Sequence, residues 1–238
     1  MNSIEVCISP ALFEYKTTNE NYIVAIVDVL RATTAFCAAF DSGVESVIPV
    51  SGLEELLEYK NKGYLTAAER NGEKVDFADF GNSPTVFLQS SLSGKELVYS
   101  TTNGTQAVQI AKGSGCIVIA AFSNLSAVCN WILEQQKNVI ILCSGWKNTF
   151  SLEDTLCAGA IVEKLLASGK FISAGDATLA AQIIWIDAKE NLFEAVKEGS
   201  HFQRLKSMGL DEDLEYCFLL DTTRVVPVWD GFKMKKAT

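Results

Sequence analysis

The chain has 238 residues, of which 48% are hydrophobic, and a formal net charge of −9. An acidic surface of this kind argues against nucleic acid or an anionic membrane as the main partner. No apolar run reaches the roughly 18 residues of a membrane span, and the segment after Met1 lacks the basic start of a signal peptide, so we expect a cytoplasmic protein with no membrane partner.

Strands and helices alternate over the first 170 residues. Apolar and β-branched runs predict the strands, and apolar residues at helical spacing predict the helices between them. The predicted strands are 4–8, 22–29, 44–50, 64–68, 97–100, 116–121 and 139–143, and the predicted helices are 32–41, 53–60, 105–111, 125–135 and 152–168. In the loop-rich stretch after residue 75, Asn82-Ser83-Pro84 predicts a turn followed by the start of a helix.

A helical pattern dominates residues 176–220, and a last strand is predicted over 225–229. The alternation predicts an α/β fold with three layers, α/β/α, around a mostly parallel or mixed central sheet. We expect a single domain over residues 1–238. The more helical stretch 170–220 leaves open a lobe packed on the sheet.

Seven cysteines are scattered along the chain, an odd number without a Cys-x-x-Cys pair. Most lie in apolar stretches, which is typical of reduced, buried thiols in a cytosolic protein. The clustered cysteine and histidine spacing of a zinc site is absent. Cys143, at a strand end, has two interpretations: a reactive thiol or a plain buried one.

Three predicted strands end in polar clusters that run directly into a helix. The clusters are Asp28 to Thr34, Ser100 to Thr105, and Cys143-Ser144-Gly145 with the nearby Ser151 to Asp154. In an α/β fold the carboxyl ends of the strands and the helix N-termini after them line one edge of the sheet, where free N–H groups favour anions. We therefore expect one site at this edge, for a metal ion and a phosphate-like group.

Asp28 lies in an otherwise apolar strand, where a charge is costly unless it is paired or bound to a cation. One interpretation is an ion pair with Arg31. The other is a Mg²⁺ ligand or a nucleophile at the strand end, because Mg²⁺ beside a phosphate takes hard oxygen ligands. Arg31 has the planar donor set that grips a phosphate or a sulfonate. Thr33 and Thr34 are interpreted as helix caps.

The segment from Ser100 to Thr105 gathers four hydroxyls and an amide around Gly104. Glycine lets the backbone approach a ligand closely, which suits a phosphate cradle, although the lysine of a P-loop is absent. An ordinary turn is the alternative. Glu69 and Arg70 follow a predicted strand and form either a second anion contact or a surface ion pair.

Glu153 and Asp154 open a predicted helix, where acidic residues are common because they complement the helix dipole. The alternative is that one of the two carboxylates reaches the site. His201 is the single histidine, in a helical context. A Ser-His-Asp hydrolase would need it, yet the Gly-x-Ser-x-Gly elbow is absent, so a structural role is favoured and His201 is a secondary candidate.

Together these motifs resemble the 2-phosphosulfolactate phosphatase family. The matching segments are VDVLRATT at 27–34, ERNG at 69–72, GNSP at 81–84, STTNGT at 100–105, CSG at 143–145, EDTLCAGA at 153–160, HFQRL at 201–205 and DLEYC at 213–217. They span almost the whole chain, in the order of the family. None of them is specific alone, whereas the combination is.

The resemblance implies a Mg²⁺-dependent acid phosphatase that converts (2R)-2-phospho-3-sulfolactate to 3-sulfolactate and phosphate in coenzyme M or sulfonate metabolism, and a homo-oligomer, for which we expect a dimer. The alternatives are a phosphatase of another small phosphorylated 2-hydroxy acid and a non-catalytic anion-binding protein.

On the phosphatase interpretation, we expect Mg²⁺ to be held by Asp28 with Glu153 or Asp154. Asp28, Arg31, Glu153 and Asp154 are the expected catalytic residues. The expected contacts to the small anionic substrate are Arg31, Glu69, Arg70, Thr101, Thr102, Asn103, Gly104 and Thr105.

Overall fold

The computed structural model describes residues 1–16 and 19–237. The strands are β1 (Asn2–Cys7), β2 (Tyr22–Val27), β3 (Ser46–Pro49), β4 (Leu65–Arg70), β5 (Glu73–Lys74), β6 (Glu96–Ser100), β7 (Cys116–Ala120), β8 (Asn138–Cys143), β9 (Phe171–Ala174), β10 (Pro227–Trp229) and β11 (Met234–Lys236). The helices are α1 (Ala32–Asp41), α2 (Leu53–Asn61), α3 (Pro84–Leu88), α4 (Gly104–Ala111), α5 (Leu125–Gln135), α6 (Leu152–Ala167), α7 (Asp176–Ala188), α8 (Leu192–Val196), α9 (Ser200–Ser207) and α10 (Asp211–Cys217), with short 3-10 turns η1 (Pro10–Tyr15), η2 (Phe122–Asn124) and η3 (Lys189–Asn191).

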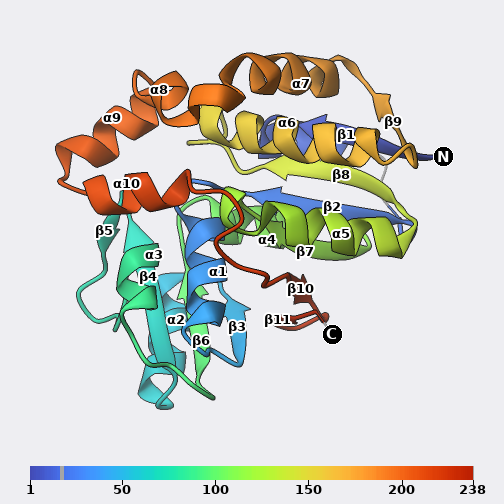
Figure 1. Cartoon of the computed structure of the whole chain (residues 1–238). Helices are drawn as coiled ribbons and strands as arrows, with labels where there is room; N and C mark the ends of the chain where they lie inside the picture. Colours follow the sequence, from blue (N-terminus) through green and yellow to red (C-terminus); the bar gives the residue numbers. More distant parts are fainter. Residues whose placement is uncertain (17–18, 238) are drawn as a thin grey trace.

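The described strands form one mixed sheet in the order β5-β4-β6-β3-β11-β10-β7-β2-β8-β1-β9. It contains two parallel sets, β7-β2-β8-β1-β9 and β4-β6-β3. The C-terminal hairpin β10–β11 lies between them and is antiparallel to β7 and to β3. In Figure 1 the first set runs across the view and the second runs down it.

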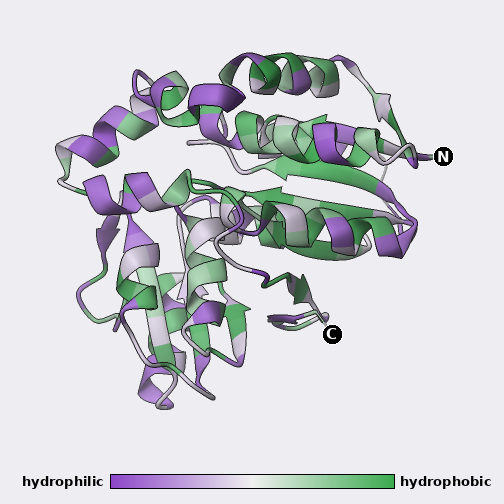
Figure 2. Cartoon of the chain, viewed as in Figure 1, coloured by the Kyte–Doolittle hydropathy of each residue, from purple (hydrophilic) through white to green (hydrophobic). Residues whose placement is uncertain are grey.

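Helices cover both faces of the larger parallel set, as the apolar strands require. On one face, Ile23, Ala25 and Val27 of β2 pack with α5 and α6, and on the other face Val24 and Ile26 pack with α1 and α4. A strand covered on both sides needs a continuous apolar run. The green central strands of Figure 2 show this run. The α/β fold with three layers, predicted from the sequence, is confirmed.

The C-terminal third differs from the prediction in three respects. Residues 171–174 form the edge strand β9, of which only Phe171 is buried, so the apolar alternation that signals a strand is missing. The helical stretch 176–220 is divided into α7, η3, α8, α9 and α10, with glycines at 199 and 209 between the last three helices. The predicted last strand is shorter, 227–229, and it pairs with the unexpected strand β11.

One local prediction is confirmed. Ser83 caps α3, its hydroxyl accepting a hydrogen bond from the N–H of Val86, with Pro84 as the first helical residue. Ser151 caps α6 in the same way, through the N–H of Asp154. Among the described helices, none combines the length and the apolar character needed to cross a membrane.

Candidate active site

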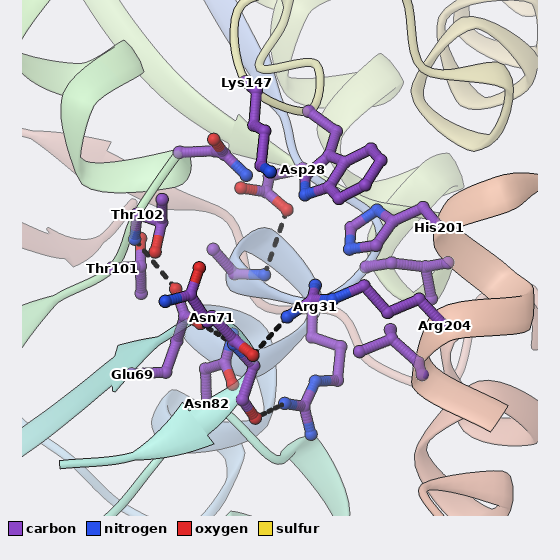
Figure 3. Close-up of a pocket in the computed structure, with 16 residues that line it drawn as sticks. Asp28, Arg31, Glu69, Asn71, Asn82, Thr101, Thr102, Lys147, His201 and Arg204 are labelled. Carbon is purple, nitrogen blue, oxygen red and sulfur yellow. Dashed lines mark hydrogen bonds between the residues drawn. The ribbon is translucent and has the colours of Figure 1, made fainter. Parts of the chain in front are cut away.

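A pocket lies where the ends of β2, β4 and β6 meet the loop after β8 and one face of α9 (Figure 3). Its lining residues are Asp28, Leu30, Arg31, Ala32, Glu69, Asn71, Gly72, Asn82, Thr101, Thr102, Asn103, Trp146, Lys147, His201, Arg204 and Leu205. The structure therefore brings two of the predicted strand-end clusters, 28–34 and 100–105, to one place. No residue of the third cluster lines the pocket; the loop that follows Gly145 contributes Trp146 and Lys147 instead.

Asp28 lies at the base of the pocket, immediately after β2, and is only 5% exposed. Its Oδ1 accepts one long hydrogen bond, 3.3 Å from the N–H of Ala32, and its own N–H donates to Thr33 Oγ1 at 3.0 Å. Burial raises the pKa of Asp28 to about 7, although the nearby positive charge of His201 acts in the opposite direction. A carboxylate with so few protein partners is poised to accept a cation or a proton.

Arg31 does not pair with Asp28, so the ion-pair interpretation is wrong. Its Nη1 donates to Oδ2 of Asp213 at 2.5 Å, and its Nη2 donates to the carbonyl of Gly72 at 2.9 Å. Oδ1 of Asp213 also accepts the hydroxyls of Ser83 and Thr85, each at 2.7 Å. This buried hub on α10 holds the end of β2, the 69–72 turn and the start of α3 together.

Glu69 joins the turn after β4 to the turn after β6. Its Oε1 accepts the N–H of Thr102 at 2.8 Å, and its Oε2 accepts the N–H of Gly72 at 2.6 Å. Both oxygens are thus used to fix the backbone, while the side chain still lines the pocket. With Asp28 it supplies the two carboxylates of the lining.

Gly104, the first residue of α4, allows this helix to start against Asp28. A Cβ on residue 104 would lie 2.5 Å from the Cβ of Ala32 and 3.0 Å from Oδ2 of Asp28. The first N–H groups of a helix have no partner inside it, and they carry a partial positive charge. The start of α4 therefore presents N–H groups beside the Asp28 carboxylate, of which that of Thr105 is used by Thr101 Oγ1.

The threonines of the 100–105 segment divide into two groups. Thr101 and Thr102 line the pocket, whereas Thr105 is fully buried outside it. Thr101 Oγ1 accepts the N–H of Thr105 at 3.0 Å, and Thr105 Oγ1 accepts the N–H of Thr101 at 3.1 Å. Thr105 thus shapes the turn and does not face the pocket.

Arg70 also lies outside the pocket, on the other side of the 101–102 turn. Its Nη1 donates to the carbonyl of Glu69 at 2.7 Å and its Nη2 to Ser100 Oγ at 2.8 Å. With Ser51 and Gln106 it lines a separate depression. Alternating side chains of a strand point to opposite sides, which explains why Glu69 faces the pocket and Arg70 does not.

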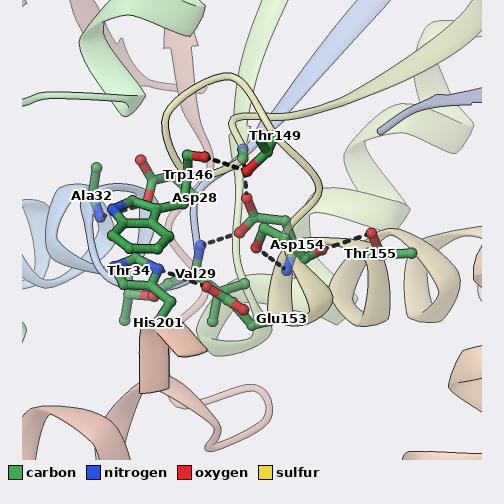
Figure 4. A network of polar contacts seen from close by, with 12 residues as sticks. Asp28, Val29, Ala32, Thr34, Trp146, Thr149, Glu153, Asp154, Thr155 and His201 are labelled. Atoms are coloured by element: carbon green, nitrogen blue, oxygen red, sulfur yellow. Dashed lines mark hydrogen bonds and ion pairs between the residues drawn. The ribbon is translucent and has the colours of Figure 1, made fainter. Parts of the chain in front are cut away.

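Both carboxylate oxygens of Asp154, which was predicted as a metal ligand, accept backbone N–H groups (Figure 4). Its Oδ1 accepts the N–H of Val29 at 2.8 Å and its Oδ2 accepts the N–H of Gly145 at 3.0 Å. Burial raises its pKa well above the ordinary value, and the charges of Glu153 and Asp28 add to this. Asp154 fastens the ends of β2 and β8 to α6 and does not line the pocket.

Glu153 is also absent from the pocket lining, because His201 covers it. Oε1 of Glu153 lies 2.8 Å from Nδ1 of His201, and both side chains are nearly buried. The ring of His201 stacks on that of Trp146, with centroids 5.6 Å apart and planes 9° from parallel. The structural interpretation of His201 overlooked this placement: the ring is in the pocket, facing Asp28 (Figure 3).

Lys147 and Arg204 are pocket cations that sequence reasoning missed. Lys147 Nζ lies 5.0 Å, and the guanidinium carbon of Arg204 lies 5.7 Å, from the centroid of the Trp146 ring. Arg204 also donates to the carbonyl of Asn71. His201 and Arg204 are three residues apart on α9 and so share a helix face, a spacing that could have paired them from the HFQRL segment.

Cys143, at the end of β8, is fully buried. Burial raises the pKa of its thiol well above the ordinary value, and the carboxylate of Asp154 raises it further. Because the thiolate is the reactive form, a thiol in this environment is inert. Cys143 is a packing residue of the strand end.

The donor set of the pocket fits a Mg²⁺ ion that is shared with a phosphate. Within residues 1–16 and 19–237, no group of three or more His, Cys, Asp or Glu side chains is arranged to enclose a metal ion. Mg²⁺ at phosphate sites is commonly held by one or two carboxylates, with waters and substrate oxygens completing the shell. Asp28 and Glu69 are the two carboxylates in the lining, and they match this pattern.

Comparisons with known proteins give one consistent family. A family model described as "2-phosphosulpholactate phosphatase" matches residues 7–231. A "Probable 2-phosphosulfolactate phosphatase" of Thermotoga maritima is 39% identical over 202 residues, covering 85% of this chain and 86% of the relative.

Two further relatives carry the same description. The protein of Caldanaerobacter subterraneus subsp. tengcongensis is 35% identical over 208 residues, or 86% of each chain. The protein of Clostridium botulinum is 31% identical over 218 residues, which cover 90% of this chain and 91% of the relative.

Proposed function

This chain belongs to the 2-phosphosulfolactate phosphatase family and is a phosphoric monoester hydrolase, and on that premise we propose that its pocket hydrolyses (2R)-2-phospho-3-sulfolactate to (2R)-3-sulfolactate and phosphate. One observation supports the assignment to this pocket: the carboxylate of Asp28 lies against the start of α4, and helix N-termini favour anions. A catalytic carboxylate and an anion site are thus adjacent.

The substrate carries three anionic groups, a phosphate, a sulfonate and a carboxylate, and the pocket offers a counterpart for each of them. We place the phosphoryl group at the start of α4, beside the pocket residues Thr101, Thr102 and Asn103. The sulfonate and carboxylate are placed toward Lys147 and Arg204, which flank Trp146. Arg31 supports the pocket floor through Asp213 and Gly72 and lends its positive charge to the pocket.

We propose Mg²⁺ as the cofactor, held by Asp28 and Glu69. When bound there it would supply positive charge that neutralises the phosphoryl oxygens. Asp28 orients the attacking water through its carboxylate, or attacks phosphorus itself; both routes need this residue. Glu153 and Asp154, predicted as ligands from the sequence, do not line the pocket and are left out of the proposed metal shell. Glu69 does line it, and each of its oxygens accepts one backbone N–H and keeps a second lone pair for a cation.

Phosphate release from phosphosulfolactate tests the proposal, first with Mg²⁺ and then with EDTA. We expect release that EDTA abolishes and fresh Mg²⁺ restores. Release that persists in EDTA would remove the metal from the account and keep the phosphatase. The profile over 2-phospholactate and 2-phosphoglycerate, which lack the sulfonate, separates this substrate from other phosphorylated 2-hydroxy acids: we expect both to be poorer.

We further propose that the enzyme acts in the cytoplasm, in coenzyme M or other sulfonate metabolism. All seven cysteines are free thiols, which suits a reducing compartment.

We also propose a homodimer. On α7, Leu179, Ile183 and Ile186 are 53%, 58% and 51% exposed, and apolar patches of this kind commonly mark protein interfaces. Light scattering on the purified chain tests this, with a mass of two chains expected and a mass of one chain as the contrary result.

A further inference from the structure

His201 has the contacts of an oriented catalytic histidine. Its Nδ1 is bonded to Oε1 of Glu153 at 2.8 Å, which fixes Nδ1 as the proton donor of that bond. No partner of the other ring nitrogen, Nε2, is present among the described residues. Stacking on Trp146 holds the ring plane (Figure 4).

The surroundings of Nε2 are those of a reaction site. The other charged groups that line the pocket with the ring are Asp28 and Arg31 after β2, Glu69 of β4, Lys147 in the loop after β8, and Arg204 on α9 itself. His201 lies close enough to Asp28 for its charge to oppose the effect of burial on the pKa of that carboxyl. A purely structural histidine has no need of a pocket position beside the catalytic carboxylate.

The substrate creates a need for an acid. A secondary alkoxide such as that of sulfolactate is a poor leaving group, and its departure from phosphorus is accelerated when a positioned side chain gives it a proton. A metal ion and backbone N–H groups stabilise the phosphoryl oxygens but cannot deliver a proton to the bridging oxygen. Histidine is the side chain whose ordinary pKa suits this task near neutral pH.

We propose that His201 is the general acid that protonates the leaving oxygen through Nε2, and that Glu153 is its positioning residue; this rests on the proposed function. As water forms the new bond to phosphorus, the bridging P–O bond breaks and its electron pair goes to the sulfolactate oxygen. That oxygen takes the proton from Nε2. One proton of the attacking water stays on the released phosphate, and the other restores Nε2–H.

The test compares two leaving groups in the same variants. Phosphosulfolactate needs protonation of its alkoxide, whereas p-nitrophenyl phosphate releases a phenolate that is stable without it. We expect His201→Asn to lower kcat/KM for phosphosulfolactate by about 10²–10⁴-fold and that for p-nitrophenyl phosphate by less than about tenfold. We expect Glu153→Gln to lower the ratio of kcat/KM for phosphosulfolactate to kcat/KM for p-nitrophenyl phosphate as well, by a smaller factor.

The ratio of the two rates does not depend on the fraction of folded protein, so partial misfolding of a variant cannot imitate the result. Glu163→Gln is the matched control, because Glu163 is also on α6 and also accepts a ring N–H, from Trp185 at 2.7 Å, but lies outside the pocket. This variant should leave the ratio unchanged.

Equal losses on both substrates in His201→Asn would overturn the acid role and leave the phosphatase assignment standing. An unchanged ratio in Glu153→Gln would overturn the positioning role of Glu153. No turnover of either substrate by the wild-type chain, with Mg²⁺ present, would instead overturn the proposed function, and the role of His201 with it.

Discussion

Asp28 is buried with one long hydrogen bond to its carboxylate, and burial raises its pKa from 3.8 to about 7. A raised pKa means that the folded chain holds a proton that the unfolded chain has already lost. The stability that this proton provides is complete below about pH 4 and is lost as the pH rises through 7.

We therefore expect the metal-free protein to lose stability between pH 4 and pH 7, and Asp28→Asn to lose less over the same range, because an amide does not ionise. Urea unfolding in EDTA at a series of pH values measures the difference. Parallel pH profiles for the two proteins would show that ionisation of Asp28 has no cost in the folded state.

Gly104 leaves no space for a side chain beside Asp28, since an added Cβ would meet Ala32 and Asp28. We expect Gly104→Ala to destabilise the fold by about 1–3 kcal/mol through overpacking. It should lower turnover by about 10²-fold, because the start of α4 must move. Gly81→Ala is the control: its Cβ would make only ordinary contacts, at 3.4 Å or more. Similar activity in both variants would contradict the close approach.

A substitution of Asp213 tests whether its ion pair with Arg31 stabilises the fold. Both side chains of this ion pair are 3% exposed, so removal of the carboxylate leaves a buried, unpaired guanidinium. We expect Asp213→Asn to lower the free energy of unfolding by about 3–5 kcal/mol. Asp211→Asn, an exposed carboxylate at the start of the same helix, should change it little. A loss below about 1 kcal/mol in Asp213→Asn would contradict the hub.

At the scale of elements, the strands with continuous apolar runs were predictable from the sequence. The site at their ends was predictable only in part. The apolar runs of β2 and β6 and the polar residues after them placed Asp28 and Gly104 correctly at the sheet edge. The direction of a side chain at a strand end depends on the pleat and on the loops around it. This is why Glu69 reaches the pocket while Arg70, its neighbour, does not.

The elements that the sequence did not reveal are those whose partners are distant along the chain. β9 and β11 have too few buried residues for a periodic signal, and they exist because β1 and β3 offer them an edge. For α9 the helix itself was expected, within the helical stretch 176–220, but its contact with the pocket was not, and this contact brings His201 and Arg204 there. Glu153, 48 residues away, fixes one of them.

For the whole molecule, the C-terminal hairpin is the joint between the two parallel sets of strands. Met234 of β11 is fully buried and pairs with Val47 of β3, while Val228 of β10 pairs with Val118 of β7. The chain end thus completes the sheet that carries the strand ends of the pocket. Without it, β4-β6-β3 would have no sheet connection to β2 within the described residues.

We expect Met234→Ala to lower the free energy of unfolding by about 2–5 kcal/mol, because it opens a cavity at this joint. Lys236→Ala, exposed on the same strand, is the control and should have little effect. Denaturant melts of both variants give the comparison. Equal, small effects would mean that the hairpin is not an integral part of the core.

The central claim is that the Asp28 pocket hydrolyses phosphosulfolactate, and the most direct test is the rate of phosphate release by Asp28→Asn with Mg²⁺ present. The account predicts steady release by the wild-type chain and a loss of about 10³-fold or more in the variant. Asp187→Asn, on the exposed face of α7, should keep wild-type turnover. Near-normal release by Asp28→Asn would contradict the claim.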